Sequence, residues 1–269
     1  MPAESTTHIT FTENTVTADG FDIRYAEAGQ GAPLVFLHGA GGLVVAPAHR
    51  MLAREFRVVL IEIPGFGASA PNRRSTSTKE LATTVHEAAR GVVGDRYTVI
   101  GTSFGSRIAS WVAVQHPDEV EGLMMLAPTG ILPGTFEPPT GERMVNGIRH
   151  LYAHPETARP LVDLDLETAN KHAELVGRLL TPRDAELEDA YRTLTVPTVV
   201  LIGTEDRRTP TSLGRRYVEL NREIAVLFVY DAGHVLEEER PEAVADVIAN
   251  FARHKLGVLV NNADNRLFP

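Results

Sequence analysis

Hydrophobic and polar residues alternate near the start of the chain, which is the pattern of strands buried on one face only. Residues 9–11 and 21–25 are apolar at every second position. Asp19-Gly20 lies between the two runs, and this dipeptide is typical of a two-residue hairpin turn. The pattern predicts two antiparallel strands joined by a tight turn at residues 19 and 20.

Later apolar runs are continuous, as is expected for strands that are buried on both faces of a sheet. They occupy residues 33–37, 57–63, 97–100, 123–126, 196–202 and 225–230. Helical spacing of apolar residues is found between them, in residues 78–90, with Thr78 as the predicted N-cap, and in residues 104–115. A further helix is predicted from Pro241 to about Lys255. Because strands alternate with helices, we expect right-handed crossovers and a mostly parallel sheet flanked by helices.

The alternation of strands and helices stops between residues 130 and 192. This stretch begins with several Pro and Gly residues, and it continues with apolar stripes at helical spacing in residues 144–152 and 175–180. About 60 residues seldom bury enough apolar surface to fold alone. We therefore predict that residues 130–192 form a helical cap, inserted into a core made of residues 1–129 and 193–269.

Composition narrows the class of protein. The 269 residues are 43% hydrophobic and 23% charged, as in ordinary globular proteins, and their net charge is −9. An acidic surface repels phosphate backbones and anionic lipids, so we expect neither a nucleic-acid nor a membrane partner. The absence of Cys excludes disulfides and cysteine nucleophiles. The polar first fifteen residues do not resemble a signal peptide, so a cytoplasmic location is expected.

One short motif places a serine where a predicted strand gives way to a predicted helix. Gly101-Thr102-Ser103-Phe104-Gly105 follows the apolar run 97–100. Flanking glycines permit a tight turn that lifts the serine hydroxyl clear of the sheet edge. The helix behind Ser103 presents free N–H groups to developing negative charge. Two glycines around a serine can also form an ordinary turn, but the strand and helix on either side favour a nucleophile.

A serine nucleophile needs a base, and ten histidines are available. His234 comes directly after the last apolar run and before the last helix, so we expect it at the carboxyl edge of the sheet, beside Ser103. His234 is therefore the predicted base. Eight other histidines lie in helical, terminal or loop positions and are expected to be surface or structural residues: His8, His49, His86, His116, His150, His154, His172 and His254.

A carboxylate is expected to orient the imidazole and to stabilise its charged form. Gly203-Thr204-Glu205-Asp206 follows the apolar run 196–202, which places it at the same edge of the sheet. By position alone, both Glu205 and Asp206 fit this role.

The loop after the third predicted strand is rich in glycine, with the sequence His38-Gly39-Ala40-Gly41-Gly42. Small residues let the backbone approach a bound carbonyl, and the amides of Ala40 and Phe104 are the predicted donors to an oxyanion. The predicted supporting residues are His38, Gly39, Gly101 and Gly105. The loop lacks the glycine spacings of nucleotide-binding motifs, and nothing in the chain implies a metal or a cofactor.

In these motifs the chain resembles the α/β-hydrolase superfamily. The similar segments, which span about Phe21 to Phe251, are His38-Gly39, Pro64 to Gly67, Gly101 to Gly105, His116 to Asp118, Gly203 to Asp206 with Pro210, and Gly233-His234. The resemblance implies the α/β-hydrolase fold, with an eight-stranded, mostly parallel sheet and a small helical cap after strand 6. In that family Gly-x-x-Asp after the seventh strand supplies the acid. Asp206, rather than Glu205, is then expected to complete a triad with Ser103 and His234.

The start of the predicted cap is similar to that of meta-cleavage-product hydrolases, which cut a C–C bond in vinylogous β-ketoacids. The similar residues are 130–136, 148–152 and Pro155-Glu156. Three features differ: Val235 replaces the family's tryptophan, Thr102 replaces its asparagine before the nucleophile, and the cap is shorter. No residue aligns with the family's cap arginine, and the cations nearest to its place are Lys171 and Arg178.

We therefore expect a serine hydrolase that acts on a small apolar ester or on a keto substrate with a scissile C–C bond. A carboxylesterase, a lactonase or a cofactor-free perhydrolase would use the same triad. Epoxide hydrolases and haloalkane dehalogenases are disfavoured, because those relatives carry aspartate where Ser103 stands. An alternative from another class is a non-catalytic receptor that binds a small ligand in the same pocket. The expected partner is a small-molecule substrate, and a homodimer is compatible with the sequence.

Overall fold

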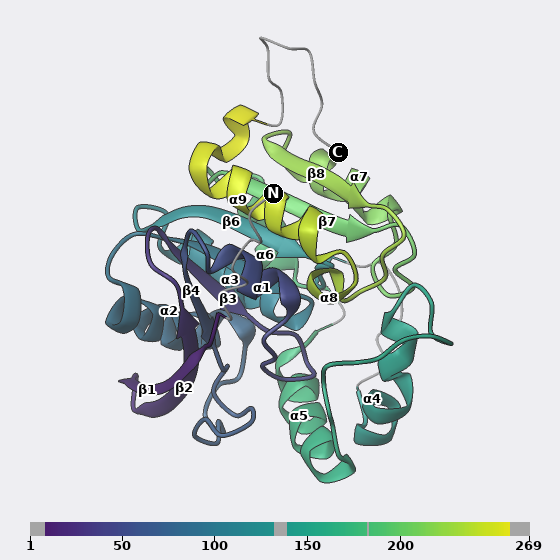
Figure 1. Cartoon of the computed structure of the whole chain (residues 1–269). Coiled ribbons are helices and arrows are strands. Elements are labelled where there is room, and N and C mark those ends of the chain that lie inside the picture. The colour runs from purple at the N-terminus through teal and green to yellow at the C-terminus, as the bar shows by residue number, and fades with distance from the viewer. Residues whose placement is uncertain (1–8, 132–138, 182, 259–269) are drawn as a thin grey trace, which may run out of the picture.

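The computed structural model describes residues 9–131, 139–181 and 183–258. In this part of the chain, eight strands form one sheet in the order β1-β2-β4-β3-β5-β6-β7-β8 (Figure 1). The strands are β1 (Thr12–Ala18), β2 (Phe21–Ala28), β3 (Pro33–Leu37), β4 (Arg57–Ile61), β5 (Tyr97–Thr102), β6 (Val120–Leu126), β7 (Thr198–Gly203) and β8 (Ile224–Val229). Among these strands, the pairs β1/β2 and β2/β4 are antiparallel, and the other five pairs are parallel. The prediction of a mostly parallel sheet is therefore confirmed.

The predicted hairpin is confirmed as the pair of β1 and β2. Ala18 lies opposite Phe21 in the register, so a two-residue turn joins the strands. Both turn residues have positive φ, 47° for Asp19 and 74° for Gly20, as the handedness of such a turn requires. β1 begins at Thr12, so the apolar residues Ile9 and Phe11 precede the strand.

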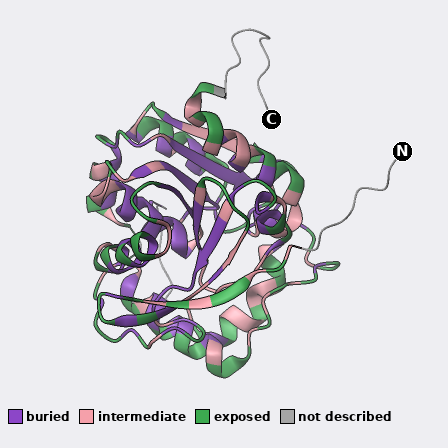
Figure 2. Ribbon diagram, turned by 60° about the vertical axis from the view of Figure 1, so that its left-hand side comes forward, coloured by how far each residue is buried: buried purple, intermediate pink, exposed green. Residues whose placement is uncertain are grey.

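Helices cover both faces of the sheet, and each face has its own hydrophobic cluster. The helices are α1 (Pro47–Leu52), α2 (Thr78–Val93), α3 (Phe104–Gln115), α4 (Gly141–Gly147), η1 (Ile148–Leu151, 3-10), α5 (Leu166–Leu179), α6 (Ala185–Tyr191), α7 (Ser212–Leu220), α8 (Leu236–Glu239), α9 (Pro241–His254) and η2 (Lys255–Val258, 3-10). α2, α3, α6 and α7 share one cluster with strand residues, whereas α1, α8 and α9 share the other. Figure 2 shows the strands buried between the helices. None of the helices described is long and apolar enough to cross a membrane.

Burial on both faces explains the continuous apolar runs. In β3, Leu34 and Phe36 belong to one cluster, and Val35 and Leu37 belong to the other. Successive residues of a strand point to opposite faces, so every position of such a strand must be apolar when helices cover both sides.

The N-cap of α2 is Ser77, and the prediction of Thr78 was wrong by one residue. The Ser77 backbone is extended, and its hydroxyl accepts a hydrogen bond from the backbone N–H of Glu80 at 3.1 Å. Thr78 is already helical and is buried. Serine and threonine are both good N-caps, so the local sequence could not choose between these neighbours.

Between β6 and β7 the chain forms α4, η1, α5 and α6, which with their described connections we call the β6–β7 insertion. The helix predicted over residues 144–152 is wrong in its second half. α4 ends at Gly147, η1 continues to Leu151, and the backbone of Tyr152 is extended. Glycine is a poor helix former, which explains the early end. Part of the Pro- and Gly-rich start of this segment, residues 132–138, lies outside the described residues.

A matched pair of leucines tests the packing. Leu201 of β7 is fully buried, whereas 48% of Leu166 at the start of α5 is exposed. We expect Leu201→Ala to lower the free energy of unfolding by about 2–5 kcal/mol, because it leaves a cavity in the core. Leu166→Ala should change it by well under half as much. Urea denaturation of both variants measures the difference, and equal losses would contradict the assignment of the core.

Candidate active site

Ser103 occupies a tight turn between β5 and α3. Its backbone has φ 52° and ψ −114°, a conformation that L residues rarely adopt. The two flanking glycines are required by close backbone contacts. A Cβ on Gly101 would lie closer than 3.0 Å to Gly105, and a Cβ on Gly105 would lie equally close to the carbonyl oxygen of Leu37. The motif therefore has glycine because neighbouring main chain occupies the space of a side chain.

The structure brings Ser103, His234 and Asp206 together from three loops that follow β5, β8 and β7. The Ser103 Oγ lies 2.8 Å from Nε2 of His234. Nδ1 of the same imidazole lies 2.8 Å from Oδ2 of Asp206. His234 and Asp206 are both buried, at 4% and 7% exposure. In this arrangement the hydroxyl can give its proton to the imidazole while the carboxylate holds the opposite ring nitrogen.

Asp206 is held as a carboxylate by several donors. Its Oδ1 accepts hydrogen bonds from the backbone N–H groups of Arg208 and Thr209, at 2.8 and 2.9 Å. Burial by itself would raise the pKa of Asp206, but the hydrogen bond to His234 and these two amides bring that pKa below its ordinary value. The rival Glu205 is exposed, and its backbone amide binds the Ala232 carbonyl instead. The geometry thus favours Asp206 over Glu205.

The loop that carries His234 is fastened to the β6–β7 insertion. The His234 backbone N–H donates to the carbonyl of Leu151 at the end of η1, at 2.6 Å. A Cβ on Gly233 would lie closer than 3.0 Å to that same carbonyl, so residue 233 must be small. Glu239 reinforces the junction, since its carboxylate accepts from the amides of Gly233 and Ala153, at 2.8 and 2.7 Å.

The glycine-rich loop after β3 lies directly beside Ser103. A Cβ on Gly39 would come within 3.4 Å of the Ser103 Cβ. The amides of Ala40 and Phe104 have no hydrogen-bond acceptor among the residues that the structure describes. Both belong to residues that line the cavity next to Ser103. Two free N–H groups beside a serine hydroxyl are the donors that an oxyanion hole requires.

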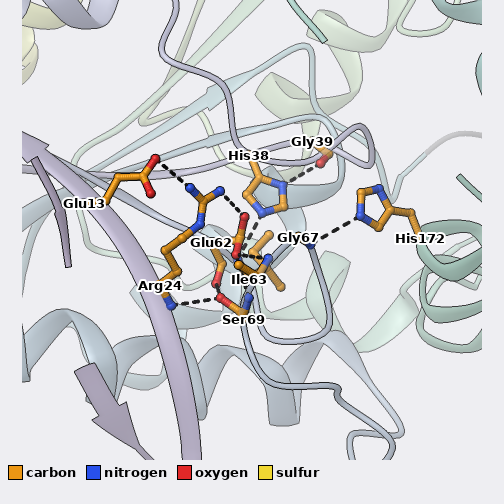
Figure 3. A network of polar contacts seen from close by, with 10 residues as sticks. Glu13, Arg24, His38, Gly39, Glu62, Ile63, Gly67, Ser69 and His172 are labelled. Carbon is orange, nitrogen blue, oxygen red and sulfur yellow. Dashed lines mark hydrogen bonds and ion pairs between the residues drawn. The ribbon is translucent and has the colours of Figure 1, made fainter. Parts of the chain in front are cut away.

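His38 holds this loop from behind (Figure 3). Its Nε2 accepts the backbone N–H of Ile63 at 3.0 Å, and its Nδ1 lies 2.7 Å from the carbonyl oxygen of Gly39. Burial lowers the pKa of His38 to about 4, so the ring is neutral at pH 7, with its proton on Nδ1 as these partners require. Figure 3 also shows the ion pair of Glu62 with Arg24 next to the ring. His38 therefore serves as a rigid brace for the loop.

His172 of α5 approaches the same loop from the β6–β7 insertion. Its ring lies 4.4 Å from the ring of Phe66, and Nε2 is 3.5 Å from the backbone N–H of Gly67. A surface or structural role was expected for His172, and the structure shows a packing role, since the residue is buried and only 3% exposed. Its neighbours come from distant segments, so spacing along the chain gave no signal.

A cavity of about 550 Å³ opens in front of Ser103. One wall comes from the loops of the sheet edge, and the other comes from α4, η1 and α5. The lining residues of the insertion are mostly apolar: Met144, Ile148, Leu151, Val162, Leu164, Val176 and Leu180. Neither Lys171 nor Arg178 lines it, since Lys171 pairs with Glu167 and Arg178 donates to the carbonyl of Asn72. The charged lining residues were not predicted from the sequence, and they are Arg107, Arg143, Arg208, Glu237 and Glu238.

One cluster away from this cavity combines groups that can bind metals. Ligand atoms of His86, His116 and Glu119 lie within 4.8 Å of one another. The two imidazole rings are stacked almost parallel, 3.4 Å apart with an angle of 8°. Their in-plane lone pairs therefore do not converge on one point. Tyr97 contacts His86, and Arg90 pairs with Glu119, so the cluster is better described as a structural polar contact.

Comparisons with known proteins agree with this fold. A model of the alpha/beta hydrolase family matches residues 34–247. The chain is 23% identical over 280 residues to a 2-hydroxy-6-oxo-6-(2'-aminophenyl)hexa-2,4-dienoic acid hydrolase of Metapseudomonas resinovorans, covering 92% of this chain and 93% of that protein. A crystal structure of a serine hydrolase involved in carbazole degradation matches with a TM-score of 0.72 and 22% identity, over 90% of this chain and 98% of that one. An esterase from Thermogutta terrifontis matches with a TM-score of 0.73 and 19% identity, at the same coverage.

The hydrogen bond between Ser103 and His234 leads to a chemical prediction. A fluorophosphonate should label Ser103, because the imidazole makes its hydroxyl nucleophilic. Asp206→Asn should slow labelling by about a thousandfold or more, since the amide favours the wrong imidazole tautomer. Glu205→Gln is the matched control and should label within a few-fold of the parent rate. Mass spectrometry gives the modified residue and the rate, and a larger loss from Glu205→Gln than from Asp206→Asn would reverse the assignment.

Proposed function

The chain belongs to the α/β hydrolase family, and on that premise we propose that it is a serine hydrolase with Ser103 as its nucleophile. The single observation that supports this most is the continuous hydrogen-bond chain from Ser103 through His234 to Asp206. Its members come from three separate loops, and two of them, Ser103 and His234, line one cavity. A purely structural role for all three groups would not need the serine hydroxyl to line a cavity.

In the proposed reaction, Ser103 attacks a substrate carbonyl while His234 takes the hydroxyl proton. The amides of Ala40 and Phe104 stabilise the oxyanion of the tetrahedral intermediate. His234 then gives the proton to the leaving group, and a water molecule releases the acyl group by the same route in reverse. Asp206 keeps the imidazole in the required tautomer throughout.

The proposed substrate is small and largely apolar, and it is either an ester or a ketone with a scissile C–C bond. The cavity of about 550 Å³ has room for a molecule of this kind, and the apolar residues of the β6–β7 insertion would contact it. The chain is similar over most of its length to a dienoic acid hydrolase, and for this reason we include C–C bond hydrolysis among the proposed reactions. That reaction would use the same residues, with Ser103 and His234 first promoting ketonisation of the dienol. We further propose that residues 130–192 act as a cap that limits substrate size.

A carboxylesterase, a lactonase and a perhydrolase remain alternatives within the same chemistry. A receptor that binds a small ligand without turnover is the alternative from another class. Turnover of p-nitrophenyl esters of graded acyl length, measured beside turnover of a 2-hydroxy-6-oxo-dienoate, separates these cases. Esterase and C–C hydrolase differ in the preferred substrate, and a receptor gives no turnover above that of Ser103→Ala.

Ser103→Ala tests the nucleophile directly. We expect the variant to lose ester turnover by a factor of about a thousand or more, because no other hydroxyl of the described residues is hydrogen-bonded to the imidazole of His234. Its thermal midpoint should stay within a few degrees of the parent value, since only one oxygen is removed. Circular dichroism melting and the p-nitrophenyl ester assay give the two values. Turnover that survives the substitution would remove Ser103 from the mechanism.

The role of the β6–β7 insertion in substrate size can be tested with two neighbouring leucines. Leu164 lines the cavity, whereas Leu161 is 48% exposed and does not. Leu164→Trp should fill part of the cavity and shift the preferred acyl chain to a shorter length. Leu161→Trp should leave the length profile unchanged. Identical profiles in both variants would contradict contact between the insertion and the acyl chain.

A further inference from the structure

The loop after β7 carries Asp206 and the loop after β8 carries His234, so these two loops hold the proposed acid and the proposed base. A hydrogen bond joins the loops, from the backbone N–H of Glu205 to the carbonyl of Ala232, at 2.9 Å. Each loop also extends beyond this bond toward the β6–β7 insertion. The distance between acid and base therefore depends on what holds the rest of both loops.

A three-residue segment of the insertion contacts both loops through its backbone. It consists of Leu151, Tyr152 and Ala153, and we call it the support segment. On the base side, the carbonyl of Leu151 accepts the backbone N–H of His234 at 2.6 Å. On the acid side, the guanidinium of Arg207 donates to the carbonyls of Tyr152 and Ala153, at 2.8 and 3.2 Å. All three carbonyls of the support segment are thus bound by the two loops.

Arg207 comes directly after the proposed acid, and its side chain binds only the support segment among the described residues. It does not line the cavity, and it forms no ion pair with a carboxylate of the described chain. The planar guanidinium presents its N–H groups in a fixed fork, so one side chain can bind two neighbouring carbonyls at once. The two carbonyls therefore explain this arginine, whereas contact with a substrate or with an opposite charge does not.

The support segment also packs tightly against the base loop. A Cβ on Gly233 would lie closer than 3.0 Å to backbone atoms of all three residues of the segment. The carboxylate of Glu239 binds the backbone N–H groups of Gly233 and Ala153, at 2.8 and 2.7 Å. Because close-packed groups transmit displacements, a shift of the segment must move the backbone of His234. A shift of about 1 Å in a catalytic group can lower a rate about a hundredfold.

We propose that Arg207 is a positioning residue, which holds Asp206 and His234 at their working distance by binding the acid loop to the support segment. Arg207 touches neither the substrate nor the reacting atoms in this role. The inference rests on the proposed function, because it assigns Arg207 to the geometry of the proposed triad. It gives the insertion a second task besides forming the cavity wall, since the support segment then belongs to the frame of the triad.

Two probes of different size distinguish this role from simple support of the cavity wall. Methanesulfonyl fluoride is small and reacts at a serine hydroxyl with little contact to the insertion, whereas a long-chain alkyl fluorophosphonate extends along the cavity. Arg207→Ala should slow the labelling of Ser103 by both probes by a similar factor, about 10–100-fold, because the base is displaced. Mass spectrometry at successive times gives both rates. If Arg207 supports only the wall, the long probe is slowed and the small probe is not, and the proposal is wrong.

Two further variants complete the test. Arg207→Lys keeps the charge but not the fork, so it should recover part of the rate with both probes. It also decides the matter if circular dichroism shows that Arg207→Ala is unfolded, since it should still slow both probes equally, by about threefold or more. Arg215→Ala is the matched control, because the Arg215 side chain is 86% exposed and pairs only with its helical neighbour Glu219. Labelling at the parent rate is expected there, and parent rates in the Arg207 variants would overturn the proposal.

Hydrogen exchange of the His234 backbone amide gives a result that does not depend on reactivity. Arg207→Ala should speed the exchange of this amide about tenfold, because its acceptor at Leu151 is held less firmly. The amide of Leu201 in the buried strand β7 should exchange at the parent rate, which excludes a general loss of stability. If neither probe labels Ser103 in the parent, the proposed function fails, and exchange measured by NMR decides this inference alone. An unchanged rate at His234, or an equal increase at Leu201, would then refute it.

Discussion

The whole site depends on one crowded backbone turn between β5 and α3. Gly101, Gly105 and the carbonyl of Leu37 approach so closely that no Cβ fits between them. This contact holds Ser103 at positive φ and directs its hydroxyl away from the sheet. It also sets the start of α3, whose first amide is free beside that hydroxyl. A backbone contact at the edge of the sheet therefore determines the position of Ser103 and of the first amide of α3.

The surroundings of the site combine rigid polar braces with an apolar wall. His38 and the pair Arg24–Glu62 hold the glycine-rich loop from behind, and the amides of Arg208 and Thr209 hold Asp206. These groups keep fixed dipoles in position where water would otherwise have to reorient. The cavity wall from the β6–β7 insertion is mostly apolar, which strengthens the electrostatic interactions inside.

The sequence was most informative where short-range geometry dictates residue type. Alternating and continuous apolar runs predicted the hairpin and the parallel sheet, and Gly101-x-Ser103-x-Gly105 pointed to the turn that the structure contains. The acid could be chosen only through the family resemblance, because Glu205 and Asp206 are adjacent and chemically alike. Glu237 was out of reach, since three successive glutamates are typical of a solvated turn. Its burial comes from packing against α1 and the sheet edge, which no local pattern encodes.

The hydrogen bond from the His234 backbone N–H to the Leu151 carbonyl links the position of the imidazole to the position of the cavity wall. Leu151 ends η1, which forms part of the cavity wall, and its carbonyl fixes the height of the imidazole above Ser103. An outward displacement of η1 would thus pull on the imidazole of His234, the proposed base, as well as widen the cavity. In such an open state the serine would lose its base while solvent gains access. Under the proposed function, the protein would then be reactive only while its substrate is enclosed, which would protect Ser103 from unproductive encounters.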